Sequence, residues 1–226
     1  MVTTTPITAI ILAAGLSRRM GNANKLLLPF GQSTILTTTV GNILNAKIGQ
    51  TLVVVGHEAQ NVQTVLAAKR QNALAHSVAD AKNDPLSINT ENSPKMTILT
   101  NHHYEKGMTT TIQTGVEAAD DESLGYMICL SDMPFISPSE YAFLTNEFLK
   151  ILEMDNQAIV QPTFKGKRGN PTIFSSFYKK HILAQTYTEG CKPIVQTHTA
   201  HVYVVEMPTD SVLQDIDSKE DYEAVT

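Results

Sequence analysis

The stretch that decides the fold is Ile7-Thr8-Ala9-Ile10-Ile11-Leu12-Ala13-Ala14-Gly15-Leu16-Ser17-Arg18-Arg19-Met20-Gly21-Asn22-Ala23-Asn24-Lys25. Residues 7–13 are rich in β-branched side chains and almost continuously apolar, which predicts a strand buried on both faces. Small residues and cations follow, and small residues let backbone N–H groups approach an anion closely. The stretch therefore predicts a buried strand that leads into an anion-binding loop.

Outward from this strand, short apolar runs alternate with segments of helical period, which predicts a mostly parallel sheet with helices on both faces, a three-layer α/β/α fold. We expect strands at residues 51–55, 96–99, 126–130, 158–160 and 201–205, and helices at residues 33–46, 57–69, 109–119, 138–153 and from 218. The turn at residues 165–171 and the apolar run 172–174 predict a small β-hairpin beside the main sheet, followed by two short helices.

The composition favours one compact domain over residues 1–226 with a polar insertion at about 70–95. The chain has 17 Lys and Arg against 22 Asp and Glu, a formal net charge of -5, and 42% hydrophobic residues. This balance disfavours a general nucleic-acid binder, which needs a basic face. The two cysteines, Cys129 and Cys191, fit neither a zinc module nor a disulfide framework, and we find no signal peptide or membrane span, so we expect a cytoplasmic protein.

The loop after the first strand carries fixed positive charge at Arg18, Arg19 and Lys25. A triphosphate needs both such charge and a closely approaching backbone. The loop is neither a Walker A sequence nor a dinucleotide-binding fingerprint, because the glycine spacings of both patterns are absent. The alternative is a loop in which small residues only permit close packing and the arginines are solvated.

The string from Leu12 to Gly21, with Lys25 after it, resembles the family of nucleotidyltransferases that attach a nucleotide to molybdopterin. The resemblance implies that this loop holds the nucleotide, with Gly15, Ser17 and Arg19 at the phosphates and Lys25 at the α-phosphate. It implies the following nucleotide-binding residues: Leu12, Ala13, Ala14, Gly15, Ser17, Arg19, Lys25, Asn101, Thr110 and Thr111. Ala13-Ala14-Gly15 resembles the branch of the family that uses CTP, whereas the branch that uses GTP tends to have two adjacent glycines.

Two acidic segments further along the chain also match this family. Asp132 follows the predicted strand 126–130, at the end of a strand where open α/β sheets bind ligands, and a carboxylate there suits Mg²⁺. The segment from Asp215 to Asp217 resembles the closing segment of the family, and its two carboxylates share one face of an extended chain. The resemblance makes Asp132 and Asp217 the Mg²⁺ ligands; the alternative for Asp132 is a cap of the turn before Pro134.

The acceptor is expected at the basic turn, where Gly169-Asn170-Pro171 matches the family and Lys167 and Arg168 add charge for a terminal phosphate. A basic surface turn is the alternative. Residues 189–194 depart from the family pattern, which leaves the identity of the acceptor open. His198 and His201 are not expected to bind a metal.

These features predict Mg²⁺-dependent transfer of CMP from CTP to molybdopterin with release of pyrophosphate, in which Arg19, Lys25 and Asp132 are catalytic. The alternatives are guanylyl transfer from GTP, nucleotidyl transfer to another phosphorylated small molecule, and a non-catalytic protein that delivers the molybdenum cofactor. A molybdoenzyme or its chaperone is a possible partner, and neither nucleic acid nor a membrane is expected.

Overall fold

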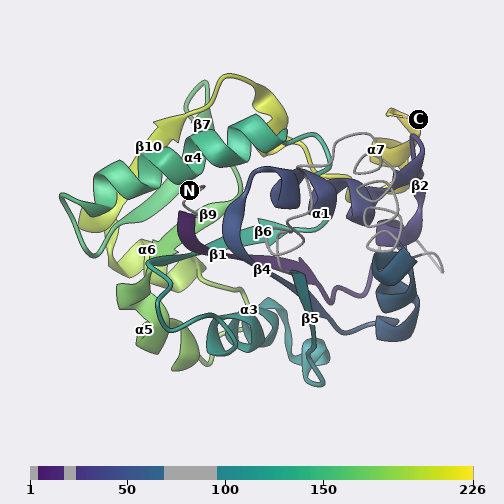
Figure 1. Cartoon of the computed structure of the whole chain (residues 1–226), viewed down its shortest axis with the longest axis horizontal. Helices are drawn as coiled ribbons and strands as arrows, with labels where there is room; N and C mark the ends of the chain where they lie inside the picture. Colours follow the sequence, from purple (N-terminus) through teal and green to yellow (C-terminus); the bar gives the residue numbers. More distant parts are fainter. Residues whose placement is uncertain (1–4, 18–23, 69–95, 226) are drawn as a thin grey trace, which may run out of the picture.

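A computed structural model describes residues 5–17, 24–68 and 96–225 of the chain (Figure 1). Its main sheet has eight strands, with seven in the order β10-β7-β9-β6-β1-β4-β5, while β8 pairs only with β7. The strands are β1 (Thr5–Ala13), β4 (Ile48–Val55), β5 (Met96–Thr100), β6 (Gly125–Leu130), β7 (Ile159–Phe164), β8 (Lys167–Arg168), β9 (Thr172–Ser175) and β10 (Val202–Glu206). The predicted insertion at 70–95 lies outside the described residues.

Strand β1 lies between two parallel partners, β4 and β6, and β4 in turn pairs in parallel with β5. Alternate residues of a strand point to opposite faces, so Ile7, Ala9 and Ile11 join one core while Ile10 and Leu12 join the other. This two-sided burial explains why the strand is apolar at nearly every position. The mostly parallel sheet expected from the sequence is confirmed.

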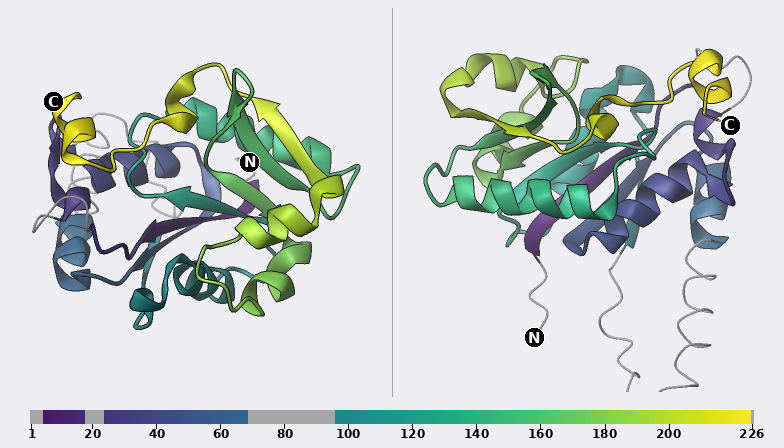
Figure 2. Two further views of the ribbon diagram at one scale, coloured as in Figure 1. Left: turned by 180° about the vertical axis from the view of Figure 1, so that it is seen from behind. Right: turned by 90° about the horizontal axis from the view of Figure 1, so that it is seen from above.

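Helices cover both faces of this sheet, as Figures 1 and 2 show. One core contains α1 (Ile35–Asn45) and α4 (Pro138–Leu152), and the other contains α3 (Met108–Glu117), α5 (Lys179–Leu183) and α6 (Lys192–Thr197). Residues 59–68 form a further helix. The chain ends in α7 (Lys219–Glu223), where the Tyr222 hydroxyl donates a hydrogen bond to the Pro29 carbonyl at 2.7 Å.

The helix starts follow the capping residues of the sequence. Thr34 caps α1 and Ser137 caps α4, each in a reciprocal pair with the residue three positions later. Pro138 occupies the first turn of α4, where its missing N–H costs nothing. These caps confirm the expected starts of both helices.

A small antiparallel sheet accompanies the main sheet. It consists of β2 (Pro29–Phe30) and β3 (Ser33–Thr34), which form an antiparallel hairpin around Gly31. The predicted turn at residues 165–171 also begins a hairpin, since β8 pairs antiparallel with β7, and the apolar run after it, β9, joins the main sheet antiparallel to both β6 and β7. Three strands that pack edge to edge bury more backbone than a detached hairpin does, since central strands satisfy both edges.

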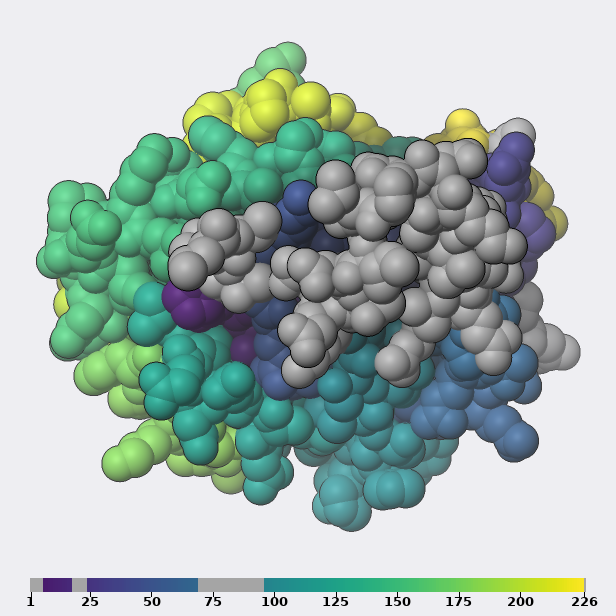
Figure 3. All heavy atoms as spheres, in the orientation of Figure 1, coloured from purple at the N-terminus to yellow at the C-terminus, as the bar shows by residue number. Residues whose placement is uncertain are grey.

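Strand β10 lies beside α4. In the space-filling view, yellow atoms of the C-terminal residues lie next to green atoms of the middle of the chain (Figure 3). Both cysteines are free and buried, and burial raises the pKa of each thiol, which keeps it protonated.

None of the helices among the described residues has both the length and the apolar character needed to cross a bilayer.

Packing of α3 on β1 gives the first prediction. A Cβ atom on Gly115 of α3 would lie 2.3 Å from Cγ2 of the buried Ile10. We expect Gly115→Ala to lower the free energy of unfolding by about 1–2 kcal/mol, because overpacking costs about 1–3 kcal/mol and exceeds the gain of up to about 1 kcal/mol from replacing a helical glycine. Urea unfolding measures the difference.

Gly15→Ala is the matched control, because a Cβ atom there would meet nothing within 4 Å. We expect this variant to unfold within about 0.5 kcal/mol of the wild type. A Gly115→Ala protein as stable as the wild type would contradict the close contact between α3 and β1.

Candidate functional site

The candidate site lies at the carboxyl ends of β1, β4, β5 and β6. These strands run parallel, so the segments that follow them meet at one edge of the sheet. A cavity of about 460 Å³ opens there. Its walls come from the loop after β1, the start of the 3-10 helix η2 (Lys25–Leu27), the segment before α3, the residues after β6 and the C-terminal segment.

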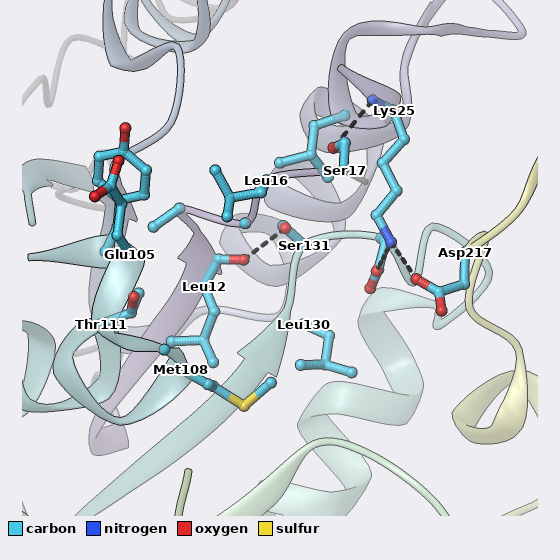
Figure 4. A pocket seen from close by; sticks show the side chains of 16 residues that line it. Leu12, Leu16, Ser17, Lys25, Glu105, Met108, Thr111, Leu130, Ser131 and Asp217 are labelled. Carbon is cyan, nitrogen blue, oxygen red and sulfur yellow. Dashed lines mark hydrogen bonds and ion pairs between the residues drawn. The ribbon is translucent and has the colours of Figure 1, made fainter. Parts of the chain in front are cut away.

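Figure 4 shows the residues that line this cavity. Lys25 and Asp217 lie on one side of it, and Glu105, Met108 and Thr111 lie on the other. The Ser131 hydroxyl donates a 2.6 Å hydrogen bond to the Leu12 carbonyl, which ties the end of β6 to the end of β1. The floor of the cavity is therefore built by two rigid, bonded strands.

The two described ends of the loop after β1 are joined by a hydrogen bond between Ser17 and Lys25. Ser17 adopts a left-handed backbone conformation with φ of 48°, and its hydroxyl oxygen accepts a hydrogen bond from the Lys25 backbone N–H at 3.4 Å. The Asn24 side chain caps η2 by accepting a hydrogen bond from the Leu26 N–H. The start of η2, and with it the base of the Lys25 side chain, is thereby held beside the cavity.

Lys25 joins the two predicted metal ligands. Its Nζ lies 2.5 Å from Oδ2 of Asp132 and 2.7 Å from Oδ1 of Asp217. The C-terminal segment is fixed next to Asp132 because the Ile216 N–H donates a hydrogen bond to the Asp132 carbonyl at 3.0 Å. Residues far apart in the sequence thus form one compact ionic cluster.

The same cluster suits a divalent cation. Asp132, Asp215 and Asp217 each offer a carboxylate oxygen within 4.8 Å of the others. Oδ1 of Asp132 is buried and has no hydrogen-bond partner among the described residues, although buried carboxylate oxygens are normally satisfied. Oxygen donors of this kind are the ligands that Mg²⁺ and Mn²⁺ prefer, so these residues fit such an ion.

Asn101 does not line the cavity, and its side chain forms hydrogen bonds within the protein. Its side-chain amide is buried and donates hydrogen bonds to the hydroxyl oxygens of Thr110 and Thr111, at 3.0 and 3.1 Å. Its side-chain oxygen accepts a hydrogen bond from the His103 N–H. With both ends of the amide occupied, Asn101 positions the first turn of α3, from which Thr111 reaches the cavity.

A second cavity of about 350 Å³ adjoins the first, and Met108 and Leu130 line both. Its apolar wall contains Ile112, Ile128, Phe174 and Val195. Its polar wall contains Gln161, Arg168, Asn170, Thr172, Glu189, Lys192 and Gln196. The two cavities together could hold two ligands whose ends meet near Leu130.

The predicted site residues divide into three groups. Those that line the first cavity are Leu12, Ala14, Gly15, Ser17, Lys25, Thr111, Asp132 and Asp217, while Arg168 and Asn170 line the second. Those that line neither are Ala13, Asn101, Thr110, Lys167, Gly169 and Pro171. Arg19 lies outside the described residues.

Among the residues that line neither cavity, Ala13, Thr110 and Gly169 have structural roles. Ala13 is buried in β1 beside Val55, and the Thr110 hydroxyl donates hydrogen bonds to backbone carbonyls of the preceding turn. A Cβ atom on Gly169 would lie 2.2 Å from the Val212 carbonyl oxygen, so Gly169 permits the close approach of the C-terminal segment. Lys167 is exposed and Pro171 is buried.

The predicted site omitted several lining residues. Tyr104, Glu105 and Met108 line the first cavity and follow Asn101 in the sequence. Gly107 and the threonines after Met108 are the feature of the sequence that could have identified this segment as part of the site. In the second cavity, Gln161 was missed because the predicted strand ended at Val160, whereas β7 continues to Phe164. A polar side chain within a buried strand was the signal there.

Glu140 at the start of α4 anchors the C-terminal segment that carries Asp217. Its buried carboxylate accepts hydrogen bonds from the hydroxyls of Ser137, Thr209 and Ser211, at 2.7, 2.5 and 2.8 Å, and from the Ser137 N–H. Burial raises the pKa of this carboxyl, but the hydrogen bonds from Thr209, Ser137 and Ser211 outweigh burial and hold the pKa below its ordinary value.

Comparison with known proteins supports this reading of the fold. A family model described as a MobA-like NTP transferase domain matches residues 9–202. No functionally curated protein matches the sequence.

Several solved structures share the fold. Rv0371c of Mycobacterium tuberculosis superposes with a TM-score of 0.71 at 18% identity, covering 97% of each chain. A Methanothermobacter nucleotidyl transferase, Mth528, gives 0.71 at 19% identity, with 97% of this chain and 95% of that chain covered. A cytidylyltransferase of Leptospira borgpetersenii gives 0.65 at 16% identity, with 98% and 85% covered.

The Glu140 anchor gives the second prediction. We expect Glu140→Gln to lower the free energy of unfolding by about 1–3 kcal/mol, because the amide keeps the shape but turns an N–H₂ group toward hydroxyls that donate to the carboxylate. Because the folded pKa lies below the unfolded value, the carboxylate stabilises the fold above a pH of about 4.3 and progressively less as the pH falls. Urea unfolding at pH 7 and at pH 3.5 measures both effects.

Glu147→Gln is the control on the same helix, since Glu147 forms a surface ion pair with Lys150. We expect it to cost less than about 1 kcal/mol. The assignment of Glu140 as an anchor fails if the two variants are equally stable at pH 7, or if the Glu140→Gln difference does not shrink at low pH.

Proposed function

This chain belongs to the MobA-like NTP transferase family, and from that membership we propose that it transfers CMP from CTP to a molybdopterin-type acceptor with release of pyrophosphate. The observation that carries the proposal is the cluster of Lys25, Asp132 and Asp217 on the wall of the first cavity, at the carboxyl edge of the parallel strands. This edge is where open α/β sheets bind their ligands.

The nucleotide is assigned to the first cavity. Ala14, Gly15 and Ser17 line it from the loop after β1, and an added Cβ atom on Gly15 would meet nothing within 4 Å. Small side chains there leave the backbone open to close approach by phosphates. Lys25 supplies an ammonium on the same wall, and Arg19 is proposed as a second phosphate ligand.

Asp132 and Asp217 are proposed to hold Mg²⁺, with Asp215 within reach of the same ion. The unpartnered Oδ1 of Asp132 supports this assignment. A structure of Rv0371c, which shares the fold, is a complex with manganese. When bound, the ion offsets the charge of the phosphates and so lowers the repulsion between donor and acceptor.

The residues of this chain act by positioning and by electrostatics. An oxygen of the acceptor's phosphate attacks the α-phosphorus of CTP, a new P–O bond forms, and the bond from the α-phosphorus to the bridging oxygen breaks. The electron pair leaves with pyrophosphate. Lys25 and Arg19 stabilise the charge that develops on the α-phosphate and on the leaving group, so no protein nucleophile is needed.

The acceptor is assigned to the second cavity, which meets the first at Met108 and Leu130. Arg168 offers a positive charge for a phosphate, and Asn170 offers an amide. Oε1 of Gln161 is buried without a hydrogen-bond partner among the described residues, so it can accept from an N–H group of a heterocycle. An apolar wall beside such groups suits a flat ring system.

CTP is proposed over GTP on the strength of Ala13-Ala14-Gly15, and a cytidylyltransferase among the proteins of similar fold is compatible with that choice. A molybdoenzyme or its chaperone is the proposed recipient of the product.

The third prediction tests the proposed activity. We expect Asp132→Asn to lower the rate of pyrophosphate release from CTP and molybdopterin at least about 100-fold, because it removes the charge of one of the two proposed metal ligands. Release is measured with CTP, GTP, UTP and ATP in turn, in the presence of Mg²⁺ and then of Mn²⁺.

Asp121→Asn is the matched control, because Asp121 is exposed and precedes β6, at the opposite edge of the sheet. It should react at the wild-type rate. Turnover with GTP alone would favour guanylyl transfer, and turnover with a different phosphorylated acceptor would redirect the acceptor assignment. Tight binding of molybdopterin with no consumption of any nucleotide would favour a delivery protein.

The fourth prediction tests the second cavity. We expect Arg168→Ala to raise the KM for the acceptor about tenfold without changing the KM for the nucleotide, as the loss of one charged hydrogen bond would. Steady-state kinetics with each substrate varied in turn measure both constants.

Lys167→Ala removes the same charge from the neighbouring position, but Lys167 does not line the cavity. We expect this variant to stay within about twofold of the wild type. Equal effects of the two substitutions would show that the general charge of the turn matters and that the cavity contact does not.

A further inference from the structure

The ammonium of Lys25 occupies the position of a cation between the two carboxylates of the proposed metal site. Nζ lies within hydrogen-bond distance of both Asp132 and Asp217. The side chains of Lys25 and Asp132 are 12% and 14% exposed, so this ion pair is largely shielded from water. Poorly hydrated opposite charges hold one another more firmly than exposed ones do.

A divalent ion and this ammonium need the same two carboxylates. Mg²⁺ binds carboxylate oxygens at about 2.0–2.1 Å, and Lys25 already lies 2.5 and 2.7 Å from oxygens of both residues. An ion on those oxygens would lie within a few ångströms of Nζ, where two positive charges repel strongly in a partly desolvated site. The two cations therefore exclude one another unless the Lys25 side chain moves.

We propose that Lys25 is a built-in competitor of the divalent metal: it pairs with Asp132 and Asp217 in the free protein and releases them when the cavity fills. This inference rests on the proposed metal assignment and is independent of the identity of the nucleotide and of the acceptor. Under this proposal the Lys25 ammonium pairs either with the two carboxylates or with a bound phosphate, so the binding of the metal and the binding of the phosphate are coupled.

The surroundings of Lys25 allow such an exchange. Its backbone N–H donates a hydrogen bond to Ser17 and the N–H of the next residue is capped by Asn24, so the start of η2 is anchored by its backbone. The flexible four-carbon stem of Lys25 lets the ammonium change position while this backbone stays in place. The side chain also lines the first cavity. An anion bound in that cavity offers the ammonium a new partner and leaves the carboxylates to the metal.

The fifth prediction measures Mn²⁺ binding to the nucleotide-free protein by electron paramagnetic resonance. We expect Lys25→Met and Lys25→Gln to bind one Mn²⁺ at least tenfold more tightly than the wild type, because the competing charge is gone. Lys25→Arg, which keeps the charge, should remain as weak as the wild type. Mn²⁺ should also raise the Tm of Lys25→Met more than that of the wild type, since it replaces the missing neutralising charge.

Lys150→Met controls for the change in net charge, because Lys150 pairs with Glu147 on the surface of α4. It should bind Mn²⁺ as the wild type does. Adding Asp132→Asn to Lys25→Met should abolish the gain, which locates the ion at this cluster. Equal or weaker binding by both neutral Lys25 variants would overturn the proposal, as would an equal gain in Lys150→Met.

The result is separable from the proposed activity. A gain in Mn²⁺ affinity in a protein that consumes no nucleotide would uphold the competition and refute the proposed transfer. Normal transfer by the wild type, without any gain in Mn²⁺ affinity in the neutral Lys25 variants, would uphold the proposed transfer and refute the competition.

Discussion

Strand β1 forms parallel ladders with β4 on one side and β6 on the other, and the site depends on this arrangement. Because the three strands run the same way, the loop that begins at Ala14 and the turn that contains Asp132 leave the sheet at one edge. Ile10 and Ile11, neighbours in β1, are each fully buried in a different core. A strand fixed on both edges and both faces gives residues 14–17, the described start of the loop that follows it, a firm base.

The described lining of the first cavity is acidic, although its proposed ligand is an anion. Glu105, Asp132 and Asp217 contribute carboxylates, and Lys25 is the only cation among the described residues that line it. A nucleotide alone would meet net repulsion there. A divalent ion would cancel the negative charge that Lys25 leaves uncompensated, so the metal and the phosphates would each make the cavity more favourable to the other.

The sequence predicted the parallel sheet and its covering helices well, because burial on both faces leaves a nearly continuous apolar run and capping residues mark helix starts. It placed Lys25, Asp132 and Asp217 at the site through the resemblance to a family that the comparison confirms. It could not predict that β9 lies antiparallel between β6 and β7, since pairing between distant segments has no local signature. Nor could it predict that the Asn101 amide donates its hydrogen bonds to Thr110 and Thr111, because hydrogen-bond partners are decided by three-dimensional packing.

The ionic cluster joins residues that are 107 and 192 positions apart along the chain. The segment that carries Asp217 is held in place by the hydrogen bond from the Ser211 hydroxyl to Glu140 and by the one from the Ile216 N–H to the Asp132 carbonyl. Because Asp217 is translated after every strand of the main sheet, a growing chain has Asp132 and the start of the loop after β1 before it has the second carboxylate of the cluster.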